Sequence, residues 1–498
     1  MKSKNKYYNQ ASALIYKIKY VGATLLFGLS TLLHPGCKKL VEVAPPTTSI
    51  NGGNVYNTDA TAIAVITAFY AKLGQTTAGG FTGSGGISFL TGLSADELTL
   101  NSGISNITQV SYYRNSLSAT AAGSEFWVTL YPYIYKCNDA IEGLNNSTTL
   151  TPTVKQQLLG EAKFMRACFY FYLINLYGDV PLVASTDYKI NALLSRSATA
   201  QVYQQIIADL KEAQASLSAN YLDGSLTGIS SERERPTKWA ATALLARVYL
   251  YTGDYFNAET QATTLINNSS FGLSLLNNAF LKASLGNKEA IWQLQPINTG
   301  HNTEDEWTFK LSNSPAGLNT THPVYISSLL LNAFELGDNR KANWISSYTT
   351  TAIPITTYFY PSKYKSATLN AAVTEYLMVF RLGEQYLIRA EARAQQNNIS
   401  GAQSDVNAIR TRAGLTNTTA STQPALLTAI LHERQVELFT EFGHRWLDLK
   451  RTNNINAVMT VVTSQKANGA AWQSYQQLYP ISLDEIQKDP NLVQNPGY

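Results

Sequence analysis

The chain has few charged residues for its length. Asp, Glu, Lys and Arg make up 14% of its 498 residues, against about 25% in typical globular proteins. It therefore offers no electrostatic case for binding a nucleic acid backbone, and we exclude nucleic acid as a partner. Its polarity comes from Asn, Gln, Ser and Thr, together with 30 Tyr. Such side chains suit neutral, hydroxyl-rich ligands, although composition by itself favours an ordinary extracellular surface.

Cysteine is scarce, and the N-terminal apolar run is too short to span a bilayer. Besides Cys37, only Cys137 and Cys168 occur, and their apolar, helix-like surroundings predict buried thiols. The uncharged run at residues 21–33 has 13 residues, whereas a transmembrane helix needs about 20. We therefore favour a cleaved segment over a membrane span.

Residues 1–36 have the pattern of a secretory signal peptide that ends at a lipidated cysteine. Five Lys precede the apolar run, and Gly36 stands directly before Cys37. We predict acylation of Cys37, with residues 37–50 as an extended tether between the membrane lipid and the folded body. Removal of the signal peptide leaves 33 basic and 34 acidic residues, a formal charge of −1. The basicity of the full chain thus belongs to the signal peptide.

The remaining residues, 51–498, predict a mainly α-helical domain of tetratricopeptide-like hairpins. Residues 239–251 and 255–267 each have apolar residues at helical spacing, and a Gly-Asp pair separates the two segments. When the sequence is shifted by 144 residues, a second such pair of segments superposes on the first. Each hairpin must stack on neighbours to bury its apolar face. Further pairs are predicted at 161–177 with 200–217 and at 60–73 with 125–144. Residues 271–370 lack a helical period and predict a loop-rich insertion with short strands, between scaffold segments 51–270 and 371–498.

Four segments resemble the SusD-like (RagB/SusD) outer-membrane nutrient-binding lipoproteins of Bacteroidetes. They are residues 160–182, residues 381–392 with 407–415, residues 433–451 and residues 479–498. The resemblance implies a non-catalytic cell-surface protein that binds an oligosaccharide and acts as a lid on a SusC-like TonB-dependent transporter barrel. It implies no cofactor and no particular substrate, and it carries no ligand-binding residues over. Two alternatives stay open: a lid for peptide uptake, and a surface glycoside hydrolase.

Charges of alternating sign in the third segment predict structural ion pairs. Arg434, Glu437, Arg445 and Asp448 stand beside Leu, Phe and Trp residues, and buried charges need partners because an unpaired one costs several kcal/mol. We expect Arg445 to pair with Asp448 or Glu437.

No catalytic or metal motif is complete. Glu433 and Glu437 have the helical spacing of a carboxyl pair, but Arg434 beside them opposes the raised pKa that a general acid needs. The run from His432 has Val436 where a zinc helix needs its second His, so we predict no metal site. The glycine-dense residues 79–86 match no phosphate or nucleophile motif and predict a flexible surface loop.

Aromatic and polar residues gather in the insertion, which makes it the predicted ligand site. Loops on a rigid scaffold concentrate binding groups, and aromatic faces stack on sugar rings. Trp292 lies in an apolar run and is expected in the core. The candidates for ligand binding are Trp307, Trp344, Asn302, Asp305 and Tyr348, near Tyr325 and Tyr358, with Asn101 in a second candidate loop.

Overall fold

The helical repeat predicted from the sequence is present in the structure, a computed structural model that describes residues 54–298, 300–311, 317–351, 353–466 and 469–498. Helices α9 (Lys238–Tyr251) and α10 (Tyr255–Ile266) form one hairpin, and α14 (Leu382–Gln395) and α15 (Ile399–Arg412) form the other. Equivalent helices begin 144 residues apart, at 238 and 382 and at 255 and 399. The repeat in sequence is therefore a repeat in structure.

The two hairpins belong to a continuous stack of helices. Its other members are α5 (Glu125–Asn146), α6 (Pro152–Tyr177), α8 (Thr199–Ser216) and α16 (Gln423–Glu437). Each packs on the next, from α5 through α6, α8, α9, α10 and α14 to α15 and α16. The predicted pairing of residues 161–177 with 200–217 is thus α6 on α8, while α2 (Asp59–Leu73) packs on both α5 and α6.

Small residues allow the helices of this stack to approach closely. Ala240, Ala241, Ala243 and Ala246 of α9 are all buried, as are Ala258 and Ala262 of α10. Cys137 and Cys168 are buried free thiols on α5 and α6, as predicted. Each buried methylene contributes about 0.8 kcal/mol, so the close packing of these helices stabilises the scaffold.

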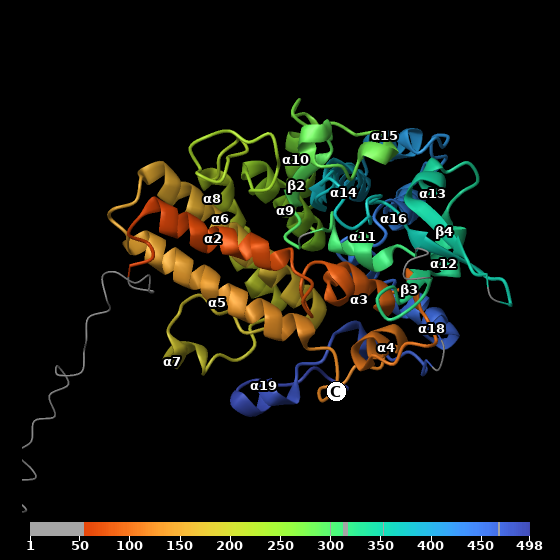
Figure 1. Cartoon of the computed structure of the whole chain (residues 1–498), viewed down its shortest axis with the longest axis horizontal. Coiled ribbons are helices and arrows are strands. Elements are labelled where there is room, and N and C mark those ends of the chain that lie inside the picture. Colours follow the sequence, from red (N-terminus) through yellow and green to blue (C-terminus); the bar gives the residue numbers. More distant parts are fainter. Residues whose placement is uncertain (1–53, 299, 312–316, 352, 467–468) are drawn as a thin grey trace, which may run out of the picture. The chain divides into compact units, whose positions relative to one another are not determined.

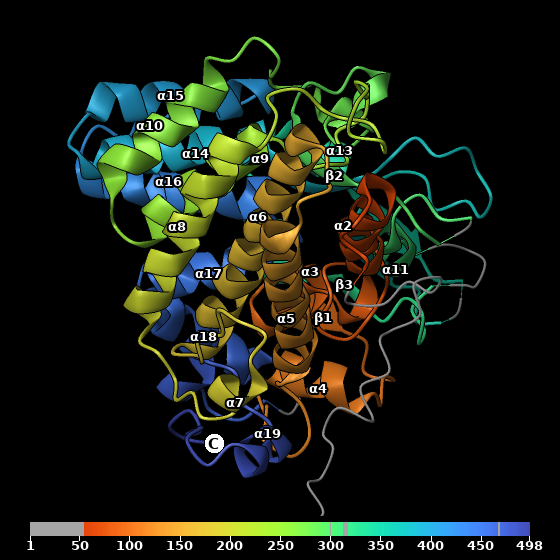
Figure 2. The ribbon, with the colours of Figure 1, turned by 90° about the vertical axis from the view of Figure 1, so that its left-hand side faces the viewer.

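The insertion is built from short elements, as the sequence predicts. They are β2 (Ala290–Leu294), α11 (Glu304–Phe309), β3 (Val324–Ile326), α12 (Ser328–Ala333), α13 (Asn339–Trp344), β4 (Ile345–Thr349) and β5 (Thr357–Pro361). Figure 2, coloured as Figure 1, shows β3 and α11 beside α3 (Ile87–Ser94) on one side of α5, with the helical repeats on the other side. Strand β2 and helix α12, by contrast, pack on α9 and α16 of the scaffold. Residues 55–498, which include the insertion, make one compact unit.

The strands of the insertion take part in three two-stranded antiparallel sheets, and two of these fix the insertion to the rest of this unit. Strand β2 pairs with β6 (Leu377–Arg381), which leads directly into α14, and β3 pairs with β1 (Leu98–Leu100). Strands β4 and β5 form a hairpin in which Tyr348 faces Tyr358. Trp292 on β2 is fully buried, as expected for a core residue. The sheets are small, but two of them join the insertion to segments far away in sequence.

The C-terminal segment returns to the N-terminal helices. Helix α19 (Leu483–Lys488) lies in this segment and follows α17 (His444–Arg451) and α18 (Ile455–Gln465). Two short helices not yet named, α4 (Ile107–Arg114) and α7 (Tyr188–Asn191), lie in the N-terminal half. The Ser482 side chain caps α19 by accepting a hydrogen bond from the Glu485 amide. Asn495 donates to the Tyr177 carbonyl at 3.0 Å, which fastens the C-terminus to α6.

Two predictions on the N-terminal region and the glycine-dense loop have different outcomes. Cys37 and its signal peptide lie outside the described residues. Within the part of the chain that the structure describes, no helix is both long and apolar enough to cross a membrane. The prediction of a flexible loop at residues 79–86 is wrong, because Phe81 and Thr82 are buried. Gly79, at φ 73°, lies so close to α5 that a Cβ there would be 2.0 Å from the Glu125 carbonyl oxygen. Close packing explains the glycines.

Candidate ligand-binding surface

Two of the predicted ligand-binding residues, Asn302 just before α11 and Asp305 within it, are buried. Asn302 Oδ1 accepts hydrogen bonds from the amides of Thr374 (2.7 Å) and Glu375 (3.0 Å). Asp305 Oδ1 accepts from Thr82 Oγ1 (2.7 Å) and the Gly83 amide (2.9 Å). Buried polar groups are normally satisfied in this way. This corrects the expectation for Asn302 and Asp305, whose side chains hold neighbouring loops and have no surface to offer a ligand.

Trp344 is also a core residue, contrary to the expectation that it faces a ligand. Its ring is 0% exposed, and its indole N–H donates to the Leu276 carbonyl at 2.9 Å. Three cations approach the ring: Lys363 at 4.9 Å from the centroid, and Arg381 and Arg412 at 5.7 Å each. Cation–π contacts of this kind strengthen when they are desolvated. Trp344 is therefore removed from the candidate ligand-binding residues.

Trp307 is partly exposed and remains a candidate. His301 stacks on its indole with centroids 4.3 Å apart and planes 19° from parallel. The carboxylate of Glu304 is 2.7 Å from His301 Nδ1 and accepts from Asn298 Nδ2 at 2.7 Å. The imidazole covers one face of Trp307, so a ligand has access only to the rest of the ring.

Three partly exposed tyrosines lie on the short strands of the insertion. Tyr348 on β4 and Tyr358 on β5 are directly opposite each other in the antiparallel register. Tyr325 on β3 meets Tyr358 edge to face, with centroids 5.0 Å apart. Opposite residues of an antiparallel pair share one face, so the three rings form an aromatic group. Hereafter Tyr325, Tyr348 and Tyr358 are called the tyrosine group.

A cavity of about 290 Å³ adjoins the tyrosine group at Tyr325. Thr99, Ser328 and Gln465 provide polar groups in its lining, and Tyr113 provides a second ring. The full set of lining residues is Ala95, Asp96, Leu98, Thr99, Tyr113, Tyr325, Ser327, Ser328, Leu329, Val462, Gln465 and Lys466. Asn101 is partly exposed and directly follows β1, whose Thr99 is opposite Tyr325.

Lys466 gives this cavity a positively charged group whose position is fixed. Its ammonium donates to the carbonyls of Leu93 (2.7 Å) and Ser94 (2.8 Å) and lies 5.3 Å from the Tyr113 ring centroid. Burial lowers the pKa of Lys466 to about 7. Asp96, also in the lining, accepts two hydrogen bonds from Arg445. Aromatic rings, hydroxyls and an amide thus surround a cavity with few free charges.

Comparisons with known proteins identify the family. Residues 57–250 match a family model described as starch-binding and associating with the outer membrane, and residues 331–498 match the SusD family model. The chain belongs to the SusD-like family. SusD-like protein P2 of Formosa agariphila is 28% identical over 429 residues, which cover 75% of this chain and 80% of that protein. Starch-binding protein SusD of Bacteroides thetaiotaomicron is 34% identical over 122 residues, 24% of this chain and 21% of its own length.

Solved SusD-like structures share the fold. Surface glycan-binding protein A from Bacteroides uniformis superposes with a TM-score of 0.74 at 20% identity, covering 88% of this chain and 99% of that one. A laminarin-binding SusD-like protein has a TM-score of 0.69 at 22% identity, with the same coverage. At such identities the likeness concerns architecture alone. It agrees with the mainly α-helical scaffold seen here.

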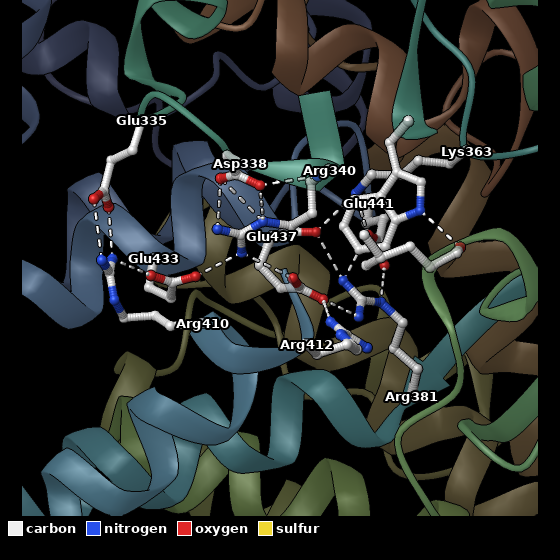
Figure 3. A network of polar contacts seen from close by, with 12 residues as sticks. Glu335, Asp338, Arg340, Lys363, Arg381, Arg410, Arg412, Glu433, Glu437 and Glu441 are labelled. Carbon is white, nitrogen blue, oxygen red and sulfur yellow. Dashed lines mark hydrogen bonds and ion pairs between the residues drawn. The ribbon is translucent and has the colours of Figure 1, made fainter. Parts of the chain in front are cut away.

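Residues 381, 410–412 and 433–441, which belong to segments that carry the SusD-like resemblance, contribute to a buried network of charges (Figure 3). Glu437 is central, because it accepts from Arg381 at 2.6 Å, from Arg340 at 3.0 Å and from Arg412. The other labelled members are Glu335, Asp338, Lys363, Arg410, Glu433 and Glu441. Arg340 and Lys363 come from the insertion, whereas Arg381, Arg412 and Glu437 come from the scaffold. The network therefore joins the two parts.

The predicted ion pairs are present, with one difference in partner. Arg434 pairs with Asp448 at 2.7 Å, and Glu437 pairs as described above. Arg445, however, contacts Asp96 at 2.7 Å and not Asp448 or Glu437. Asp96 ends up beside α17 only after the chain has folded, and nothing in the local sequence of Arg445 points to it.

The same network bears on the carboxyl pair Glu433 and Glu437. Arg340 contacts both carboxylates, at 2.6 and 3.0 Å. Burial raises the pKa of Glu437, but Arg412, Arg381 and Arg340 outweigh burial and hold it well below its usual range. Glu437 therefore stays ionised and cannot act as a general acid. Among the described residues, no three His, Cys, Asp or Glu side chains are placed to hold a metal ion.

Proposed function

We propose that this protein is a non-catalytic outer-membrane lipoprotein that binds an oligosaccharide and passes it to a SusC-like TonB-dependent transporter barrel. Membership of the SusD-like family carries the proposal, since relatives and solved structures are named for binding starch, laminarin or other glycans. The full-length lipoprotein is anchored through Cys37, and its ligand surface faces away from the cell.

We place the oligosaccharide on the tyrosine group and in the adjoining cavity. Tyr rings supply flat apolar area at a low cost in side-chain entropy, and the hydroxyl and amide groups of Thr99 and Gln465 suit hydroxyl-bearing ligands. Asn101 directly follows β1, which pairs with β3, and Trp307 lies on α11, which packs against β5; we include both in the proposed surface. Because the lining has few free charges, it favours a neutral sugar over a charged one.

Affinity electrophoresis and calorimetry with a panel that includes laminarin and starch test the proposal. Tyr325→Ala and Tyr358→Ala should each weaken binding roughly fivefold or more, as for aromatic hot spots. Tyr188→Ala is the matched control, since Tyr188 on α7 is 73% exposed and α7 lies far from β3 in both views (Figures 1 and 2). The polymer should remain intact.

Binding that survives both tyrosine substitutions would move the site elsewhere on the surface. Shortening of the polymer, abolished by replacement of one acidic residue, would favour the hydrolase alternative. Binding of peptides but of no glycan would favour the peptide-uptake alternative.

A further inference from the structure

A second cavity, separate from the candidate ligand-binding surface, lies between α2, the loop at residues 222–224 and the end of β2. Its volume is about 200 Å³, and it shares no lining residue with the first cavity. Ala71, Leu222, Leu294 and Ile297 form apolar walls, and Tyr70 adds an aromatic ring. Pockets for drug-sized ligands are about 300–1,000 Å³, so this one admits a single ring or a side chain.

The one cation in this lining is already paired inside the protein. Arg235 donates to Glu161 Oε2 at 2.7 Å and to Thr67 Oγ1 at 2.6 Å. Tyr70 donates its hydroxyl proton to the same Glu161 oxygen at 2.6 Å. The side chains of Arg235, Tyr70 and Thr67 therefore hydrogen-bond within the protein on this side of the cavity. The positive charge of Arg235 is thus committed to an ion pair with Glu161 inside the protein.

Glu234, by contrast, is a half-buried carboxylate that makes no side-chain hydrogen bond or ion pair with any of the described residues. Burial and the nearby Glu232 raise its pKa, although the charges of Arg235 and Lys282 oppose the shift. Asp223 adds a second negative charge to the lining, and its carboxylate accepts from the amide and hydroxyl of Ser225. The cavity thus combines apolar walls with one unpartnered negative charge.

We propose that this cavity binds a primary ammonium group carried on a small, partly apolar body, of the size of one amino-sugar ring. The ammonium donates to Glu234 and supplies the charge-assisted hydrogen bonds that the carboxylate lacks. Leu222, Leu294 and Tyr70 pack against the body of the ligand. The site is distinct from the proposed oligosaccharide surface, and either can fail without the other.

Calorimetry at pH 6.5 with three small probes tests this inference. The probes are glucosamine, N-acetylglucosamine and the amide of Nα-acetyl-lysine. Glucosamine should bind about tenfold or more tightly than N-acetylglucosamine, because acetylation removes the positive charge. Glu234→Gln should abolish this preference without lowering the unfolding midpoint, since Glu234 has no partner to lose among the described residues.

Glu232→Gln is the matched control, with the same change of charge two residues away. The Glu232 carboxylate is 3.2 Å from Lys282 Nζ and accepts from Ser284, outside the cavity lining. Preference for the ammonium probes should survive in this variant. Tighter binding of the lysine derivative than of glucosamine would support the same site and show that it prefers an ammonium group carried by a peptide side chain. Equal binding of glucosamine and N-acetylglucosamine, no binding of either amine, or equal losses in both variants would overturn the inference.

Discussion

At the scale of single residues, Asp305 is an acidic side chain in a site that favours its protonated form. Burial raises the pKa of Asp305 to about 6, although the Gly83 amide and the Thr82 hydroxyl oppose the shift. Both hydrogen bonds end on Oδ1, an atom that an asparagine amide can replace. Asp305, which the sequence predicted to bind a ligand, is therefore a structural residue whose ionisation lowers the unfolding free energy as pH rises.

Asp305→Asn should remove part of the pH dependence of stability. The folded pKa lies above the ordinary value of 3.8, so the unfolded chain loses its proton first as pH rises. The native state is then destabilised between about pH 4 and 6, by about 1.4 kcal/mol per pKa unit. Urea unfolding at pH 4 and pH 7 should show a smaller fall for the variant than for the parent. Parallel behaviour of the two proteins would show that Asp305 ionises normally.

The two tryptophans of the insertion should respond oppositely to truncation. Trp344→Ala leaves a cavity beside three cations and should cost about 3–5 kcal/mol of unfolding free energy. Trp307→Ala should change the unfolding midpoint little and lower glycan affinity by more than about 1 kcal/mol. Urea unfolding and calorimetry of both variants check this. Unchanged affinity in a folded Trp307 variant would restrict the site to the tyrosine group.

At the scale of elements, a buried ion pair joins α17 to the residues that follow α3. Arg445 on α17 donates from Nε and Nη2 to the two oxygens of Asp96, at 2.8 and 2.7 Å. Both side chains are buried, so removal of one partner leaves a charge without compensation. Asp96 also lines the candidate cavity, so the pair connects scaffold stability to the proposed ligand site.

Arg445→Met should lower the unfolding free energy by about 3–5 kcal/mol, because it strands Asp96. Arg445→Met combined with Asp96→Leu should recover much of the loss, since neither charge is then buried alone. Denaturant unfolding of the parent, both single variants and the double variant measures this coupling. Additive losses in the double variant would show that the two charges act independently.

At the scale of the whole molecule, the buried charge network makes the insertion and the scaffold one body. Lys363 of the insertion donates to the Glu437 carbonyl at 2.8 Å, and Arg381 donates to Glu289 and Glu437 at 2.8 and 2.6 Å. Burying so many charges is favourable only when every one is paired. A ligand surface on the insertion therefore has a rigid support, which reduces the entropy lost on binding.

Attachment to the membrane should depend on Cys37. Cys37→Ala should abolish labelling by fatty acids, because it removes the thiol that is acylated. The protein should then stay unprocessed or be released, since even a single acyl chain gives only marginal anchoring and this variant has none. Metabolic labelling and fractionation check this in native cells. Labelling that continues in the variant would contradict the prediction. Lys38 and Lys39 follow the cysteine, and protease treatment of intact cells decides which leaflet the protein occupies.

Local patterns in the sequence were enough to predict the scaffold. Helical periodicity and the 144-residue shift depend on residues a few turns apart, so they predicted α9, α10, α14 and α15 and the irregular insertion. The alternating charges around Arg434 and Glu437 likewise predicted buried pairs, because such charges beside apolar side chains cannot stay unpaired.

The choice between core and surface was made only by the tertiary structure. Trp344 and Asp305 look like binding residues in sequence, yet their partners come from residues 276, 363 and 381 and from residues 82–83. The candidate cavity likewise joins residues 95–99, 113, 325–329 and 462–466. Contacts between distant segments decide which polar and aromatic groups are satisfied internally, and local sequence does not contain that information.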